Sequence, residues 1–221
     1  MRVSNFLSIV FVAISFHFAT AQVEQINLEQ TKGQFTQTSL ELPAGEYQFA
    51  ISNNAVGSDV GFVLVPEGQY EPANHIKAAY VTAPVANNEK GMSGVVDLAP
   101  GTYEYFCPLN PTPKYTLTVR EDVEILNLTQ VEGDFKVKGI TVSEGAYQFA
   151  IGNDGIDREV GFVLVPKGQY DPANHIKNAY VKSTVPNGNM SYTNIVDLEA
   201  GEYEYFCPLN PTPKYTLTVV K

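Results

Sequence analysis

The chain has few of the residues that usually carry out catalysis. Its 221 residues include two cysteines, three histidines and no tryptophan. Beyond residue 21, the only histidines are His75 and His175, and neither lies in a motif that places a nucleophile beside a base. No zinc-helix HExxH, CxxC pair or glycine-rich phosphate loop occurs. These absences predict a protein that is not an enzyme.

Positive charge is also scarce. There are 14 Lys and Arg residues against 24 Asp and Glu, which gives a formal net charge of −10 at pH 7. Proteins that bind nucleic acid or anionic membranes usually need the opposite balance. The sequence therefore predicts no nucleic-acid partner.

Long apolar runs are absent except at the start of the chain. Arg2 is followed by a mostly apolar stretch over residues 3–18, and Ala19-Thr20-Ala21 has the small-x-small form of a signal-peptidase site. Polar residues interrupt the stretch, which is shorter than the roughly 20 apolar residues of a spanning helix. We therefore interpret residues 1–21 as a signal peptide and expect a secreted or periplasmic protein with no membrane span.

The rest of the chain is a tandem repeat of two similar halves. A shift of 100 residues aligns the two halves without a gap, and it places Cys107 on Cys207 and His75 on His175. A repeat of this length matches a small domain rather than a solenoid unit. The sequence predicts two domains, residues 22–120 and 121–221, joined by a short linker.

Both halves are predicted to be all-β. Tyr47, Phe49 and Ile51 alternate with less apolar residues, as expected for half-buried strands, and Pro, Gly and Asn clusters separate such rows. About seven strands per half follow, and only residues 72–81 allow a short helix or loop excursion. Two tandem Greek-key β-sandwiches are the simplest architecture.

The end of each half resembles a known family. Residues 97–119 read DLAPGTYEYFCPLNPTPKYTLTV, and residues 197–219 repeat this segment. The segment resembles the C-terminal strand, loop and strand of cupredoxins, the blue-copper fold. The resemblance implies a cupredoxin-like sandwich in which Cys107 and Cys207 occupy the place of the copper thiolate.

The other copper ligands do not accompany these cysteines. A type 1 site needs two imidazoles and one thiolate with a weak axial ligand. In the family pattern C-x-x-H-x-x-M the matching positions here are Asn110 and Pro113, with Asn210 and Pro213 in the second half. The stretch matching the family's upstream histidine, residues 58–62, also lacks histidine. We therefore predict that the ordinary copper site has been lost and that no cofactor is bound.

Two other uses of the cysteines remain open. Copper or another metal could be held by an altered site formed by His75 with Cys107 and by His175 with Cys207, giving an electron-transfer or copper-handling protein. Alternatively, Cys107 and Cys207 could form a disulfide across the two domains. The simplest expectation is two buried free thiols and two loop histidines bonded to the backbone.

Polar residues recur where the halves match best. Residues 60–80 match 160–180 at 18 of 21 positions and residues 101–119 match 201–219 at 18 of 19, but residues 22–59 match at only 14 of 38. A core constraint alone would not retain polar side chains. We predict a duplicated surface that binds a protein or small ligand, or else holds turns, formed by Tyr70, Asn74, His75, Lys77, Asn110, Thr112 and Lys114 with their counterparts Tyr170, Asn174, His175, Lys177, Asn210, Thr212 and Lys214.

Overall fold

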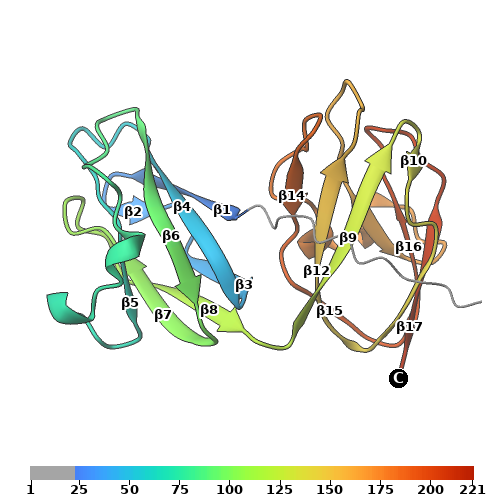
Figure 1. Ribbon diagram of the computed structural model, residues 1–221, viewed down its shortest axis with the longest axis horizontal. Helices are drawn as coiled ribbons and strands as arrows, with labels where there is room; N and C mark the ends of the chain where they lie inside the picture. Colours follow the sequence, from blue (N-terminus) through green and yellow to red (C-terminus); the bar gives the residue numbers. More distant parts are fainter. Residues whose placement is uncertain (1–22) are drawn as a thin grey trace, which may run out of the picture.

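The computed structural model describes residues 23–221, which form two similar β-sandwiches joined by a short connection (Figure 1). The predicted signal peptide lies outside the described residues. Below, residues 23–120 are called the first half and residues 121–221 the second half. The prediction of two tandem sandwiches is confirmed.

The first half packs two four-stranded sheets face to face. One sheet has the order β2-β1-β4-β6 and the other β3-β8-β7-β5. In each sheet one pair is parallel, namely β1 with β4 and β3 with β8. The strands are β1 (Glu24–Thr31), β2 (Gln34–Phe35), β3 (Ser39–Pro43), β4 (Gly45–Asn53), β5 (Val63–Pro66), β6 (Lys90–Leu98), β7 (Gly101–Phe106) and β8 (Tyr115–Arg120).

The second half repeats this arrangement with one difference. The counterpart of the continuous β6 is divided into β14 and β15, which both pair with β12. The sheet orders are β10-β9-β12-β14 and β11-β17-β16-β13. The strands are β9 (Val123–Val131), β10 (Asp134–Phe135), β11 (Ile140–Ser143), β12 (Gly145–Asn153), β13 (Val163–Pro166), β14 (Met190–Tyr192), β15 (Val196–Leu198), β16 (Gly201–Phe206) and β17 (Tyr215–Val220).

The alternating rows identified in the sequence form the core. Tyr47, Phe49 and Ile51 of β4 are all buried between the two sheets. Phe35 packs edge-on against Tyr105 with ring centroids 5.3 Å apart, an arrangement that favours aromatic pairs. An equivalent set of side chains fills the second half.

The segment at residues 72–81 differs from the expected short helix. It forms two 3-10 turns, Pro72–Asn74 and Lys77–Ala79, with the same turns at Pro172–Asn174 and Lys177–Ala179. Between them His75 and Ile76 are extended, because the Ile76 amide donates a hydrogen bond to the carbonyl of Leu64 at 2.9 Å. This anchor to the edge of β5 prevents one continuous helix. Within residues 23–221 no helix has the length and apolarity needed to cross a membrane.

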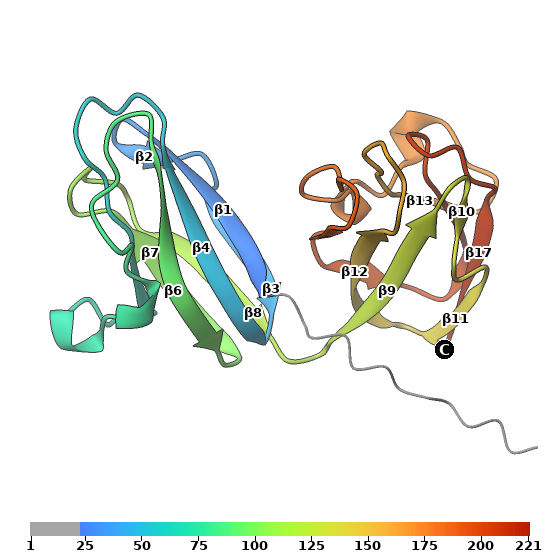
Figure 2. The same ribbon diagram turned by 45° about the horizontal axis from the view of Figure 1, so that its top comes forward.

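Figure 2 shows the connection at residues 121–122 that joins the two halves, and two ion pairs also cross between them. Arg120 at the end of β8 bonds to Glu41 at 3.2 Å and reaches Asp197 of the second half at 3.1 Å. A second ion pair joins Lys182 to Glu24 at 2.7 Å. The junction is therefore polar where the charged side chains cross it.

Candidate functional site

Each cysteine lies at the end of a core strand. β7 ends at Phe106, and the next residue, Cys107, is a buried free thiol, as is Cys207 in the second half. The sulfur of Cys107 accepts two backbone N–H bonds, from Gly61 and Asn110, each 3.2 Å long. Its own amide donates to Thr112 Oγ1 at 3.0 Å. The loop after β7 thus folds back onto the cysteine that begins it.

A buried amide side chain holds this loop to the opposite sheet. Asn110 Oδ1 accepts from the Gly33 amide at 2.7 Å, and its Nδ2 donates to Gln30 Oε1 at 3.2 Å and to the Thr31 carbonyl at 2.8 Å. Gln30 Nε2 in turn donates to the Gly61 carbonyl at 2.7 Å. Asn110 and Gln30 therefore form the cysteine-end network, which joins the loops that follow β1 and β7 to the segment that precedes β5.

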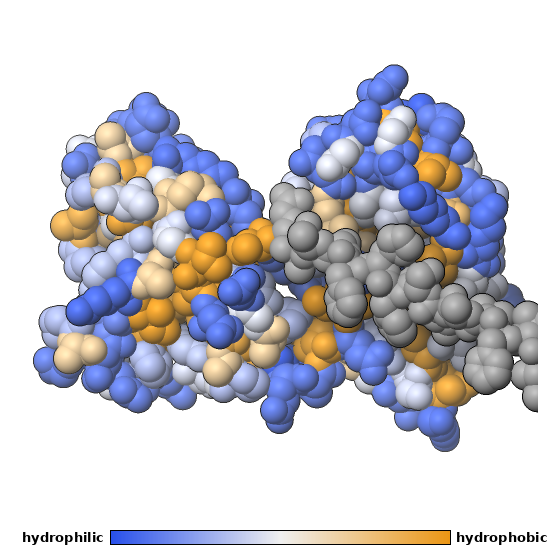
Figure 3. Space-filling model, in the orientation of Figure 1, coloured by the Kyte–Doolittle hydropathy of each residue, from blue (hydrophilic) through white to orange (hydrophobic). Residues whose placement is uncertain are grey.

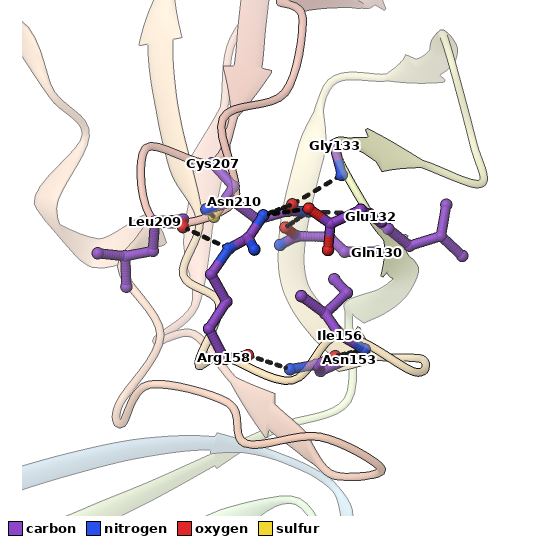
Figure 4. A network of polar contacts seen from close by, with 10 residues as sticks. Gln130, Glu132, Gly133, Asn153, Ile156, Arg158, Cys207, Leu209 and Asn210 are labelled. Carbon is purple, nitrogen blue, oxygen red and sulfur yellow. Dashed lines mark hydrogen bonds and ion pairs between the residues drawn. The ribbon is translucent and has the colours of Figure 1, made fainter.

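The second half contains the same network with an additional clamp (Figure 4). Asn210, Gln130, Gly133 and Cys207 repeat every bond of the first half. Arg158, which stands where the first half has Ser58, lies over the network. Its Nε donates to the Leu209 carbonyl at 3.2 Å, and its Nη2 contacts Asn210 Oδ1 at 3.1 Å and Glu132 at 2.5 Å. Because this ion pair is exposed, we expect it to add no more than about 1 kcal/mol.

This donor set does not fit a type 1 copper ion. Such an ion needs two imidazole nitrogens beside the thiolate. Asn110 instead supplies an amide whose oxygen and nitrogen are both already bonded within the protein. Across residues 23–221 no three His, Cys, Asp or Glu side chains are grouped closely enough to hold a metal ion. We therefore derive no redox step at Cys107 or Cys207.

His75 has two partners away from the cysteine. One ring nitrogen, Nε2, lies 3.0 Å from the Tyr70 carbonyl, and Nδ1 lies 2.7 Å from the Tyr80 hydroxyl. Because a carbonyl can only accept, Nε2 carries the proton and Nδ1 of the neutral ring accepts from Tyr80. The ring packs edge-on against Phe106, which alternates with the buried Cys107 and so faces the other side of the sheet. His175 has the same contacts in the second half.

Next to His75, three side chains form an ordered surface cluster. The Tyr70 hydroxyl donates to Glu104 Oε2 at 2.7 Å, and the Gly68 amide donates to the same oxygen at 2.9 Å. The Lys114 ammonium lies 3.1 Å from the centre of the Tyr70 ring, a cation–π contact. In the second half Tyr170 bonds to Glu204 at 2.7 Å, and Lys214 lies 3.9 Å from the Tyr170 ring centre. We call Tyr70, His75, Glu104 and Lys114, with their counterparts, the tyrosine cluster.

The charges of the cluster are tuned by these bonds. The Gly68 amide and the Tyr70 hydroxyl hold the pKa of Glu104 below its usual value. The same bond to Glu104 raises the pKa of Tyr70. The carboxylate therefore stays ionised and the phenol stays protonated over a wide pH range.

A shallow apolar pocket adjoins the tyrosine cluster in the first half. Its volume is about 290 Å³, and it lies between His75, Tyr80, Pro84 and Leu109. Leu109 belongs to the loop that follows Cys107 and is an exposed apolar side chain. The pocket places a small apolar surface beside the charged groups of the tyrosine cluster.

The predicted surface residues separate into two sets. Tyr70, His75 and Lys114 come together in the tyrosine cluster, while Asn74 and Lys77 are exposed on the neighbouring 3-10 turns. The prediction that Asn110 and Asn210 are surface contacts is wrong, because their side chains are buried, at 4% and 0% exposed. Thr112 and Thr212 are half-buried and cap the cysteine amides.

Sequence reasoning missed two participants. Glu104 recurs as Glu204 but was not assigned to the surface, although it holds Tyr70 in place. Gln30 also escaped notice, because it lies in the segment where the halves match poorly. Its identity with Gln130 inside that divergent segment was the available signal.

No family model matches the chain, and no curated protein matches it. Among solved structures, auracyanin B is 26% identical over 44% of this chain and 88% of its own, with a TM-score of 0.36. Auracyanin A, a blue copper protein from the bacterium Chloroflexus aurantiacus, is 24% identical over 45% of this chain and 100% of its own, with a TM-score of 0.34. The alignment with a multicopper oxidase covers 89% of this chain and 89% of the oxidase at 10% identity, with a TM-score of 0.33.

These structures are of the kind that the Cys107 and Cys207 segments resemble. Each half has the topology of a cupredoxin-like sandwich. In both halves a strand leads to a buried cysteine, a loop follows, and a final alternating strand returns to pair with the strand before the cysteine. The expected fold is therefore confirmed.

Proposed function

We propose that this is an exported two-domain cupredoxin-type protein that has lost the ordinary copper site and works as a binding module. The observation that carries the proposal is that both the side chain and the backbone amide of Asn110 are hydrogen-bonded within the protein. Its side chain joins β1 to the cysteine loop, and its backbone amide bonds to the cysteine sulfur. The position that would supply an imidazole to copper is thus used to hold the fold together, and Asn210 does the same.

The tyrosine cluster supports a binding role. A binding surface loses less entropy when its side chains are already fixed before the partner arrives. Tyr70 is held at its hydroxyl by Glu104 and at its ring by Lys114, and the backbone carbonyl of Tyr70 also bonds to His75. The exposed Tyr70 and Lys114 and the half-buried Glu104 offer an aromatic ring, a cation and a carboxylate to a protein or a small ligand.

Duplication strengthens this role. The same cluster occurs once in each half of a single chain, so a partner with two matching sites could bind both. Binding at the first site then raises the effective concentration at the second. A bivalent binder gains affinity in this way without any new contact.

The proposal is tested on protein recovered from the cell exterior or periplasm. We expect its N-terminus to be Gln22 and its copper content to equal that of a Cys107→Ser, Cys207→Ser variant recovered in the same way. An auracyanin treated identically is the positive control for copper retention. Recovery with an uncleaved leader would contradict export, and copper that is lost only in the cysteine variant would contradict the loss of the site.

A further inference from the structure

The two halves touch through two different surfaces. The first half contributes the β1–β3 face, and the second half contributes the β14–β15 face. Across their junction Glu24 pairs with Lys182 at 2.7 Å, and Leu40 shares a cavity of about 460 Å³ with Ile195. Ile195 is only 4% exposed although it is not part of the apolar core cluster of its own half. Because Ile195 lines this shared cavity, the contact between the halves contributes to its burial.

Because the halves are copies, each also carries the face that it does not use at this junction. In the second half the counterpart of the β1–β3 face contains Ile125 and Val137, which are 48% and 38% exposed. In the first half the counterpart of the β14–β15 face contains Val95, which is 46% exposed where Ile195 is buried. Within residues 23–221, one face of each kind is thus left without a partner.

The unused faces lie toward opposite ends of the molecule. In Figure 1 the strands follow one another from left to right in the order β6, β4, β1 in the first half and β14, β12, β9 in the second half. The free β6 side therefore belongs to one end and the free β9–β11 side to the other. In Figure 3 a band of apolar surface also crosses the first half over β4 and β6.

The unused faces are more apolar than the faces that form the internal junction. Gln25 and Gln37 of the internal junction correspond to Ile125 and Val137 on the free face. On the other free face, Asn178, Lys182 and Asn194 correspond to Ala78, Thr82 and Gly94. End repeats that only meet solvent normally carry polar outer faces. Here the free faces are instead more apolar than the junction faces, which indicates that another surface covers them.

The charges also remain complementary. Glu24 of the internal junction is retained as Glu124 on the free face, whereas its partner Lys182 becomes Thr82. Another residue supplies a positive charge on the free face. Lys90 stands at the position of Met190, and Met190 lines the same cavity as Glu24 and Lys182. A second copy docked in the internal geometry would place Lys90, which in its own half donates to Asn27 Oδ1 at 2.7 Å, on the same cavity as Glu124.

We propose that the protein binds further copies of itself head to tail. The free β6 face of one copy, which contains Val95 and is called the Val95 face, packs against the free β9–β11 face of the next copy, which contains Ile125 and is called the Ile125 face. Such a contact joins two different surfaces and so builds open chains or rings rather than closed symmetric pairs. Two cavities, of about 490 and 460 Å³, remain in the internal junction, which indicates loose packing. Because the copies are separate molecules, their assembly depends on protein concentration. This inference is independent of the partner proposed for the tyrosine cluster.

The test is sedimentation velocity over a series of concentrations of the wild-type protein, Val95→Glu and Ile125→Glu. We expect wild type to form larger species as concentration rises, and each variant alone to stay monomeric because one of its faces is blocked. A mixture of the two variants must form dimers and nothing larger, because each supplies the face that the other lacks. Leu109→Glu, at an equally exposed apolar residue outside both faces, is the matched control and keeps wild-type behaviour.

Two outcomes overturn the proposal. Wild type that remains monomeric at every concentration excludes the contact. Variants that stay monomeric when mixed show that the Val95 face and the Ile125 face do not bind each other, which contradicts the head-to-tail geometry. A charge exchange gives a second test: Lys90→Glu weakens assembly, and combining it with Glu124→Lys restores it. Circular dichroism of each variant confirms that the strands are intact.

Discussion

Replacing Asn110 by alanine tests the cysteine-end network directly. The substitution removes three hydrogen bonds of the side chain, with Gly33, Gln30 and Thr31. Each buried bond contributes about 1 kcal/mol net to stability, so the free energy of unfolding of the first half should fall by about 3 kcal/mol. Because native domains are stable by only about 5–15 kcal/mol, this loss is large.

Urea unfolding followed by circular dichroism measures the loss. Asn210→Ala should produce a similar loss in the second half, and the exposed Asn74→Ala serves as a control that stays within about 0.5 kcal/mol of wild type. Asn110→Asp should be no better than alanine, because a carboxylate would face the Gln30 and Thr31 oxygens that now accept from the amide. A change below about 0.5 kcal/mol for Asn110→Ala would refute a structural role for the network.

Three further predictions concern other parts of the chain. Glu104, whose pKa is held low by the fold, stabilises the protein above the ordinary carboxyl pKa of 4.5 and loses this effect as the pH falls through its lower folded value. Glu104→Gln should therefore make stability less sensitive to acid, and it should lower the pKa of Tyr70 toward 10.0 in an ultraviolet titration. Lys182→Ala should loosen the halves by leaving the 9% exposed Glu24 carboxylate without its cation, which small-angle scattering would detect as a larger radius of gyration. Gly33→Ala should cost about 1 kcal/mol in thermal or urea unfolding, because its φ of 76° is left-handed.

The fold could be predicted largely from the sequence, because its signals are local and repeated. The alternation at Tyr47, Phe49 and Ile51 places three side chains on one face of a strand, and that face is the core. The 100-residue repeat then gives the domain number. The two 3-10 turns could not be predicted, because the anchor of Ile76 to Leu64 joins residues that are distant in the sequence.

The candidate site was predicted only in part for the same physical reason. Recurrence of a polar residue indicates that it is constrained but does not say whether it faces solvent or the core. Tyr70 and Asn110 both recur, yet one is exposed and the other is buried. The distinction depends on Gln30, which lies 80 residues from Asn110 along the chain and meets it only in the folded sandwich.

A copper titration of the purified protein followed by visible absorption tests the role of the two cysteines. If Cys107 and Cys207 are structural thiols held by backbone amides rather than ligands of a blue copper centre, wild type gives no thiolate-to-copper band. Its spectrum is then identical to that of Cys107→Ser with Cys207→Ser. An intense blue band that approaches one copper per half, and that is lost in this variant, would contradict this structural role.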